Sequence, residues 1–152
     1  MSEWKKLLDD VRRGASLLDE EAVELKPLPA NLEFEAVEAD VSATGYLELL
    51  VFAGQERLAW AFLDPFAESP LWLDLILVTG PYREQGLGAR LLAEVERIAK
   101  SRAFDHLHGE VTINEYTPTA DRRDARAQWF KKQGFQVAQR PSGDWDIEKS
   151  LK

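Results

Sequence analysis

The residues with the clearest chemical potential form a glycine-containing turn, Arg83-x-x-Gly86-x-Gly88, between two apolar segments. Glycine has no Cβ, so the backbone N–H groups of such a turn can approach a large anion closely. The first N–H groups of a helix have no internal partner and lie at the positive end of the helix dipole. A strand followed by this turn and a helix start therefore predicts a cradle for a diphosphate, to which Arg83 can add a charge.

The turn differs from the two commonest nucleotide-binding motifs. No Gly-Lys-Ser/Thr follows it, as a P-loop requires, and its glycines do not have the G-x-G-x-x-G order of a dinucleotide fingerprint. The alternative interpretation is a plain strand-to-helix connection that needs glycine only for its shape. The position of the turn, directly after an apolar run and at the start of an amphipathic one, favours the anion cradle.

Two elements must position this turn. Residues 71–78 carry one charge in eight positions and are followed by Gly80-Pro81, which predicts a strand that ends there. Because both of its faces are apolar, the strand must be covered on both sides. Strict alternation would place positions 71, 73, 75 and 77 on one side and positions 72, 74, 76 and 78 on the other. After the turn, apolar residues recur at helical spacing at Leu87, Leu91, Val95 and Ile98.

The remaining segments give a consistent order of further elements. Helices are expected over residues 2–13, 16–25 and 121–133, the last ended by Gly134 as a C-cap. Strands are expected over residues 31–39, 44–53, 56–63, 106–114, 135–139 and 145–149. Gly54-Gln55 predicts a two-residue hairpin turn. The strand after the central helix should run parallel to residues 71–78, because a helix crossover connects them.

Two segments resemble the GNAT N-acetyltransferase superfamily. Residues 78–88 (VTGPYREQGLG) are similar to its acetyl-CoA-binding run, V-x-P-x-Y-R-G-x-G-x-G, with the proline displaced by one residue and Glu84 at a common glycine position. Residues 127–135 (AQWFKKQGF) are similar to its second helix, which typically ends in Gly-Phe. By element order the resemblance covers residues 45–150.

The resemblance implies an α+β fold, in which helices cover both faces of a mixed, mostly antiparallel central sheet. The chain is expected to form one GNAT-like acyl-CoA N-acyltransferase domain over residues 1–152. This domain would comprise an N-terminal helical segment (1–29), the sheet with the coenzyme-binding helix (31–103), and a strand, helix and hairpin (104–152). Family members usually place two helices between their first two strands; here the helices precede the first clear strand, unless residues 23–28 are themselves a strand.

The resemblance also implies acetyl-CoA as co-substrate. In the family the pantetheine arm lies where the central strand and its parallel neighbour splay apart, and a main-chain amide around Val78 would polarise the thioester carbonyl. The turn amides would hold the pyrophosphate. The predicted coenzyme-binding residues are Val78, Arg83, Gln85, Gly86, Leu87, Gly88 and Ala89.

Acyl transfer to an amine needs a proton acceptor and benefits from a proton for the departing thiolate. Asp74, the only charge in the strand at 71–78, and Glu110 on the neighbouring strand are the candidate bases; an ordered water is the alternative. The family often has a tyrosine acid in its second helix, where this chain has Phe130, which has no proton to give. Tyr116 or Tyr82 could replace it, or the thiolate could leave unassisted.

Composition and charge restrict the partners. The 152 residues suit one soluble globular domain, with no cysteine and no apolar run long enough to span a bilayer. This predicts a cytoplasmic protein without disulfides, and with only His106 and His108 as imidazoles we expect no metal site. The net charge of −8 divides into −10 over residues 1–80 and +2 over residues 81–152. Nucleic acid is therefore an unsuitable partner, whereas acidic surface could attract an amine or simply maintain solubility.

The sequence thus predicts an acyltransferase that moves acetyl from acetyl-CoA to a small-molecule or peptide primary amine by direct attack in a ternary complex. No covalent enzyme intermediate is needed, which agrees with the absence of cysteine. The alternative function is a non-catalytic acyl-CoA-binding sensor or regulatory module. The last hairpin or the helix containing Trp4 could pair two chains into a homodimer.

Overall fold

The computed structural model describes residues 24–39, 46–64 and 71–152. Its elements, in chain order, are β1 (Leu32–Ala39), β2 (Tyr46–Ala53), β3 (Glu56–Asp64), β4 (Leu71–Val78), the 3-10 turn η1 (Gly80–Tyr82), α2 (Leu87–Ser101), β5 (His106–Val111), α3 (Ala120–Lys132), β6 (Gln136–Gln139) and β7 (Trp145–Ser150). The predicted helix at 2–13 and nearly all of that at 16–25 lie outside the described residues. Residues 24–30 contain neither helix nor strand, so they give no support to a strand at 23–28.

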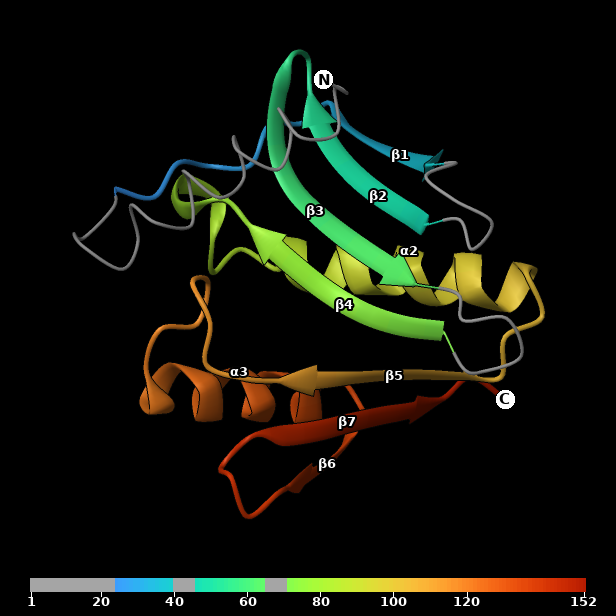
Figure 1. The fold of residues 1–152 in the computed structure, drawn as a ribbon. Helices are drawn as coiled ribbons and strands as arrows, with labels where there is room; N and C mark the ends of the chain where they lie inside the picture. Colours follow the sequence, from blue (N-terminus) through green and yellow to red (C-terminus); the bar gives the residue numbers. More distant parts are fainter. Residues whose placement is uncertain (1–23, 40–45, 65–70) are drawn as a thin grey trace.

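The described strands form one sheet in the order β1-β2-β3-β4-β5-β7-β6 (Figure 1). Neighbouring strands are antiparallel except β4 and β5, which are parallel. The expected mixed, mostly antiparallel sheet is therefore confirmed, as is the parallel strand after the central helix. Strand β5 ends at Val111, earlier than predicted, and Asn114 instead forms an isolated bridge with Thr117.

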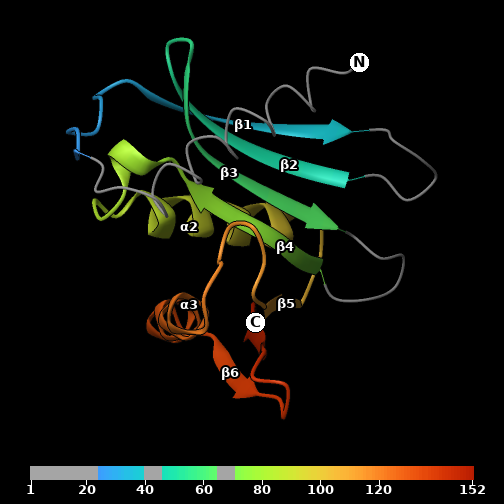
Figure 2. The same ribbon diagram turned by 60° about the vertical axis from the view of Figure 1, so that its left-hand side comes forward.

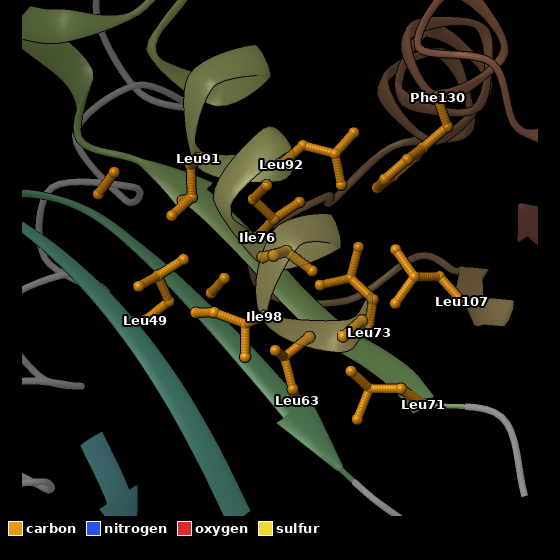
Figure 3. Packing of buried hydrophobic residues seen from close by; sticks show 14 of the residues in the cluster. Leu49, Leu63, Leu71, Leu73, Ile76, Leu91, Leu92, Ile98, Leu107 and Phe130 are labelled. Atoms are coloured by element: carbon orange, nitrogen blue, oxygen red, sulfur yellow. The ribbon is translucent and has the colours of Figure 1, made fainter. Parts of the chain in front are cut away.

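Both described helices contribute to one large core. Helix α2 packs on β3 and β4, and α3 packs beside β5, β6 and β7 (Figure 2). Leu73 and Ile76 of β4, Leu92 of α2 and Phe130 of α3 converge in this core (Figure 3). A smaller cluster on the sheet is formed by Leu50, Trp60 and Leu77, with Phe52, Phe62, Leu75 and Tyr116 packed against it.

A β-bulge in β4 overturns the predicted strict alternation of its side chains. Phe62 of β3 lies opposite Leu75, but the next residue, Leu63, lies opposite Leu73, which leaves Asp74 without a partner in β3. Such an extra residue reverses the side to which later side chains point.

The two clusters show the consequence of the bulge. Leu73 and Ile76 lie in the same large core, although strict alternation would separate them, while Leu77 lies in the smaller cluster with Trp60. The predicted grouping of Asp74 with Trp72, Ile76 and Val78 is thus wrong. The sequence is apolar on both sides of Asp74, so its pattern gives no sign of the bulge.

The end of α3 is fixed by a glycine, as predicted. Gly134 has φ of 94°, and its N–H donates to Lys131 O, while Phe135 N donates to Phe130 O. These two bonds form a Schellman motif, in which a hydrophobic contact commonly accompanies the glycine. The rings of Phe130 and Phe135 provide that contact, with centroids 5.2 Å apart. The Gly-Phe pair thus ends the helix and anchors it in the core.

Candidate functional site

A cleft of about 570 Å³ opens where β4, the start of α2 and one face of α3 meet. It is lined by Ile76, Leu77, Val78, Tyr82, Arg83, Glu84, Gly86, Leu87, Gly88, Ala89, Tyr116, Thr117, Arg122, Ala125, Arg126, Trp129 and Gln133. Six of the seven residues predicted to bind the coenzyme are in this set. The cleft is large enough for an extended small ligand.

The cleft exists because β4 and β5 separate. They pair only from Leu71–Leu73 to Leu107–Gly109. At the last pair the strands approach so closely that a Cβ on Gly109 would lie 2.9 Å from Leu73 O, so glycine is required there. Beyond this point the β5 side of β4 has no strand partner (Figure 1). The structure thus contains the divergence that the resemblance implies.

The main chain of β4 presents hydrogen-bonding groups to this gap. Thr79 N donates to Leu58 O of β3 at 2.8 Å. Because the bonding direction alternates along an antiparallel strand, Leu77 also faces β3, and Ile76 and Val78 direct their N–H and C=O groups away from it. Both residues line the cleft. The sequence interpretation identified Val78 but not Ile76.

The turn between β4 and α2 has the geometry of an anion cradle. Gly86 is the N-cap of α2 with φ of 79°, and a Cβ added there would meet nothing within 4 Å. The first turn of α2 contains no acidic side chain, so its N–H groups and dipole are not neutralised locally. Glu84, which stands at the family's common glycine position, also has a left-handed φ of 63°. This conformation strains a residue that has a side chain.

Gly88 has a packing role that the sequence did not indicate. A Cβ on Gly88 would lie 3.1 Å from Cζ2 of Trp129 and 3.8 Å from Cγ2 of Val78. The indole of Trp129 therefore lies against the first turn of α2 and joins α3 to it. Gly88 allows this close contact, in addition to lining the cleft.

Gln85 is the predicted coenzyme-binding residue that does not line the cleft. Its side chain holds the segment before β1: Nε2 donates to Lys26 O, and Oε1 accepts from Leu28 N at 3.1 Å. The position of Gln85 is therefore used to attach an N-terminal segment to the turn.

One face of α3 lines the cleft and includes two arginines that the sequence interpretation missed. Arg122, Arg126 and Trp129 recur at helical spacing along this face. Arg126 Nη2 donates to Ile76 O, so the guanidinium reaches the gap-facing main chain of β4. Burial, and then the nearby charge of Arg83, lower the pKa of Arg126 to about 10, which leaves it protonated at neutral pH. The helical spacing of these residues was the available signal.

A second, small cavity of about 20 Å³ lies at the inner end of this gap and is lined by both candidate bases. Asp74 and Glu110 line it together with Ile76 and Arg126, so Arg126 borders both cavities. Asp74 keeps an exposed side chain, but partial burial beside the sheet, and then the charge of Asp64, raise its pKa to about 6. Glu110 Oε2 lies 3.4 Å from Arg140 Nη2.

The two tyrosines considered as acids differ in their surroundings. Tyr82 is buried, and its hydroxyl donates to Glu56 Oε1 at 2.9 Å. Burial and this bond raise the pKa of Tyr82, so its proton is not available to the cleft. Tyr116 lines the cleft and packs against the cluster of Leu50, Trp60 and Leu77. Phe130, fixed in the core with 3% exposure, supplies no proton.

The described part of the chain contains no group of three or more His, Cys, Asp or Glu side chains that could hold a metal ion. His106 and His108 lie together, with ring centroids 6.2 Å apart. Among the described residues, no helix is both long and apolar enough to cross a membrane.

Comparison with known proteins identifies the class to which this fold and cleft belong. The sequence profile of the acetyltransferase (GNAT) family matches residues 8–135, which is most of the chain. The chain therefore belongs to the acetyltransferase (GNAT) family. No curated protein matches the chain significantly.

Solved structures share the fold. An N-acetyltransferase, PaiA, from Thermoplasma acidophilum in complex with coenzyme A is 22% identical, with a TM-score of 0.58 over 69% of this chain and 60% of that one. A GNAT acetyltransferase from Elizabethkingia anophelis with acetyl-CoA bound is 15% identical, with a TM-score of 0.61 over 80% of this chain and 99% of that one. A GNAT acetyltransferase from Staphylococcus aureus is 21% identical, with a TM-score of 0.57 over 72% of this chain and 70% of that one.

Proposed function

We propose that this chain is an N-acetyltransferase that moves acetyl from acetyl-CoA to a primary amine by direct attack in a ternary complex. The observation that carries the proposal is the path from the turn at Gly86, along the part of β4 at Val78 and Ile76 that has no β5 partner, to the carboxylates Asp74 and Glu110. One end of this path suits a diphosphate and the other suits an amine. Two solved structures of the same fold contain coenzyme A or acetyl-CoA, which agrees with this assignment.

The coenzyme would lie along this path with its reactive end innermost. The N–H groups at Gly86 to Ala89 would bind the pyrophosphate at the start of α2, with Arg83 at the mouth. The gap-facing groups of Val78 and the N–H of Ile76 would pair with the pantetheine arm and the thioester, whereas Ile76 O already accepts from Arg126. Since Ile76 also borders the small inner cavity, its N–H is the best-placed donor for polarising the thioester carbonyl.

The acceptor would approach from the acidic inner end. Asp74 and Glu110 would attract a protonated amine there, and the loss of its proton would make the nitrogen nucleophilic. The pKa of about 6 for Asp74 leaves the carboxylate ionised at neutral pH while keeping it closer to the working pH than an ordinary aspartate. We therefore favour Asp74 as the base, directly or through a water, with Glu110 as the second candidate.

The test is a calorimetric titration with acetyl-CoA, followed by measurement of coenzyme thiol release with a panel of amines. The proposal predicts micromolar-range binding and thiol release that depends on the amine. Binding without release for any amine of the panel would favour the acyl-CoA-binding module instead. Absence of binding would contradict both functions.

A further inference from the structure

Arg126 is a cation at the end of the cleft nearest Asp74 and Glu110. It borders both cavities and donates one N–H to Ile76 O. Among the described residues, it forms no ion pair with an aspartate or glutamate. A guanidinium has five N–H donors in a planar fork, so the bond to Ile76 leaves others for a ligand.

The position of Arg126 relative to the thioester follows from the proposed function, on which this inference rests. The N–H and C=O of a strand residue point to the same side, so the N–H of Ile76 and the carbonyl bonded to Arg126 face the same gap. A thioester whose carbonyl oxygen accepts from Ile76 N therefore lies beside the guanidinium of Arg126. The thioester sulfur, one bond from the carbonyl carbon, is then within reach of the free N–H groups.

We propose that Arg126 stabilises the departing thiolate of coenzyme A, by a charge-assisted hydrogen bond to the sulfur rather than by giving up a proton. The amine nitrogen attacks the carbonyl carbon, the C–N bond forms, the C–S bond breaks, and the electron pair of that bond goes to sulfur. The amine proton goes to the carboxylate or water at the inner end. Arg126 keeps its proton throughout, and the thiolate takes one from solvent after release.

Other groups near this point suit the role less well. Phe130, one helical turn after Arg126, is apolar and buried, and the hydroxyl of Tyr82 is bonded to Glu56. Arg83 stands at the turn, where the diphosphate would neutralise it. Tyr116 is the remaining rival, and it would act by proton donation instead of charge.

The experiment measures the ionisation of coenzyme A thiol bound to the full chain, by ultraviolet absorbance of the thiolate as a function of pH. In the wild type we expect the bound thiol to titrate about one pH unit or more below free coenzyme A, since a nearby opposite charge favours the ionised form. In Arg126→Gln, which removes the positive charge, the thiol should titrate near its free value. Arg126→Lys, which keeps the charge, should keep most of the shift.

Two controls separate this role from folding and from coenzyme binding. Desulfo-coenzyme A, which lacks the sulfur, should bind wild type and Arg126→Gln with dissociation constants within about twofold of each other. Its pyrophosphate would still bind at the start of α2, and this contact does not depend on the sulfur. Arg97→Gln, which removes an exposed arginine paired with Glu94, should leave the bound thiol as in the wild type.

Three results would overturn the inference. If wild type binds coenzyme A but its thiol titrates as in free coenzyme A, Arg126 does not stabilise the thiolate, while the proposed function stands. If Tyr116→Phe abolishes the shift and Arg126→Gln does not, the tyrosine has the role. If wild type does not bind coenzyme A at all, the proposed function fails and this inference fails with it.

Discussion

The anion cradle at Gly86 can be tested directly by alanine substitution, because Gly54 is a matched glycine outside the cleft. Gly86 and Gly54 both have left-handed backbone angles, with φ of 79° and 62°. At both positions an added Cβ would meet nothing within 4 Å. Gly54 lies in the β2–β3 hairpin and does not line the cleft, whereas Gly86 is the N-cap of α2 inside it. Alanine at each position therefore introduces the same backbone strain in different surroundings.

The expected magnitudes follow from this geometry. Alanine in the left-handed region costs about 1–2 kcal/mol, so Gly86→Ala and Gly54→Ala should lose similar free energies of unfolding. The methyl group at position 86 would also stand in the open space where the diphosphate is expected. Displacing the diphosphate from one charge-assisted N–H bond would lose about 1.5–3 kcal/mol, which is at least tenfold in dissociation constant. Gly54→Ala should leave the affinity unchanged.

The assay is urea unfolding of both variants together with calorimetric titration of acetyl-CoA. We expect parallel losses of stability in the two variants, and a loss of affinity for acetyl-CoA only in Gly86→Ala. If Gly86→Ala bound acetyl-CoA as tightly as Gly54→Ala, the cradle would not lie at this turn. If only Gly86→Ala lost stability, its effect on binding could be attributed to local unfolding, and the cradle argument would fail.

Three further predictions concern strain and ionisation. Replacing Glu84 by glycine should stabilise the chain by about 1 kcal/mol in urea unfolding, because it relieves a left-handed φ of 63°; unchanged or lower stability would contradict this account of the strain. Burial raises the pKa of Glu48 from 4.5 to about 7. Because the folded state then binds this proton more tightly than the unfolded state does, the free energy of unfolding of the wild type falls as pH rises through that range. Glu48→Gln should therefore match the wild type near pH 4 and exceed it by about 3 kcal/mol at pH 8, and an equal difference at both pH values would refute the argument. If Asp74 is the base, the rate of thiol release should rise with pH through about 6 and lose that dependence in Asp74→Asn. A pH profile that persists in Asp74→Asn but disappears in Glu110→Gln would show that Glu110 is the base.

The sequence predicted well those features that depend on local chemistry. The apolar run at 71–78, ended by Gly80-Pro81, is β4 with the predicted bounds. Gly134 is the left-handed cap that its position after α3 indicated. Gly86 is the N-cap of α2, which begins at Leu87, as the glycine turn before the first apolar position of the helix indicated.

Features that depend on tertiary contacts could not be predicted in the same way. The bulge at Asp74 arises from the pairing of β4 with β3, and a run that is apolar on both faces shows no change of period there. Arg126 was missed because its partner, Ile76 O, is 50 residues away in sequence. Gly88 was interpreted only as part of the cradle, since the approach of Trp129 depends on how α3 packs against α2.

The most direct test of the central claim is a crystal structure of the chain with coenzyme A. We expect pyrophosphate oxygens on the N–H groups from Gly86 to Ala89, and a pantetheine arm paired with the gap-facing groups of Val78 and the N–H of Ile76. Coenzyme A bound elsewhere, or bound in the cleft with its pyrophosphate away from the start of α2, would contradict it.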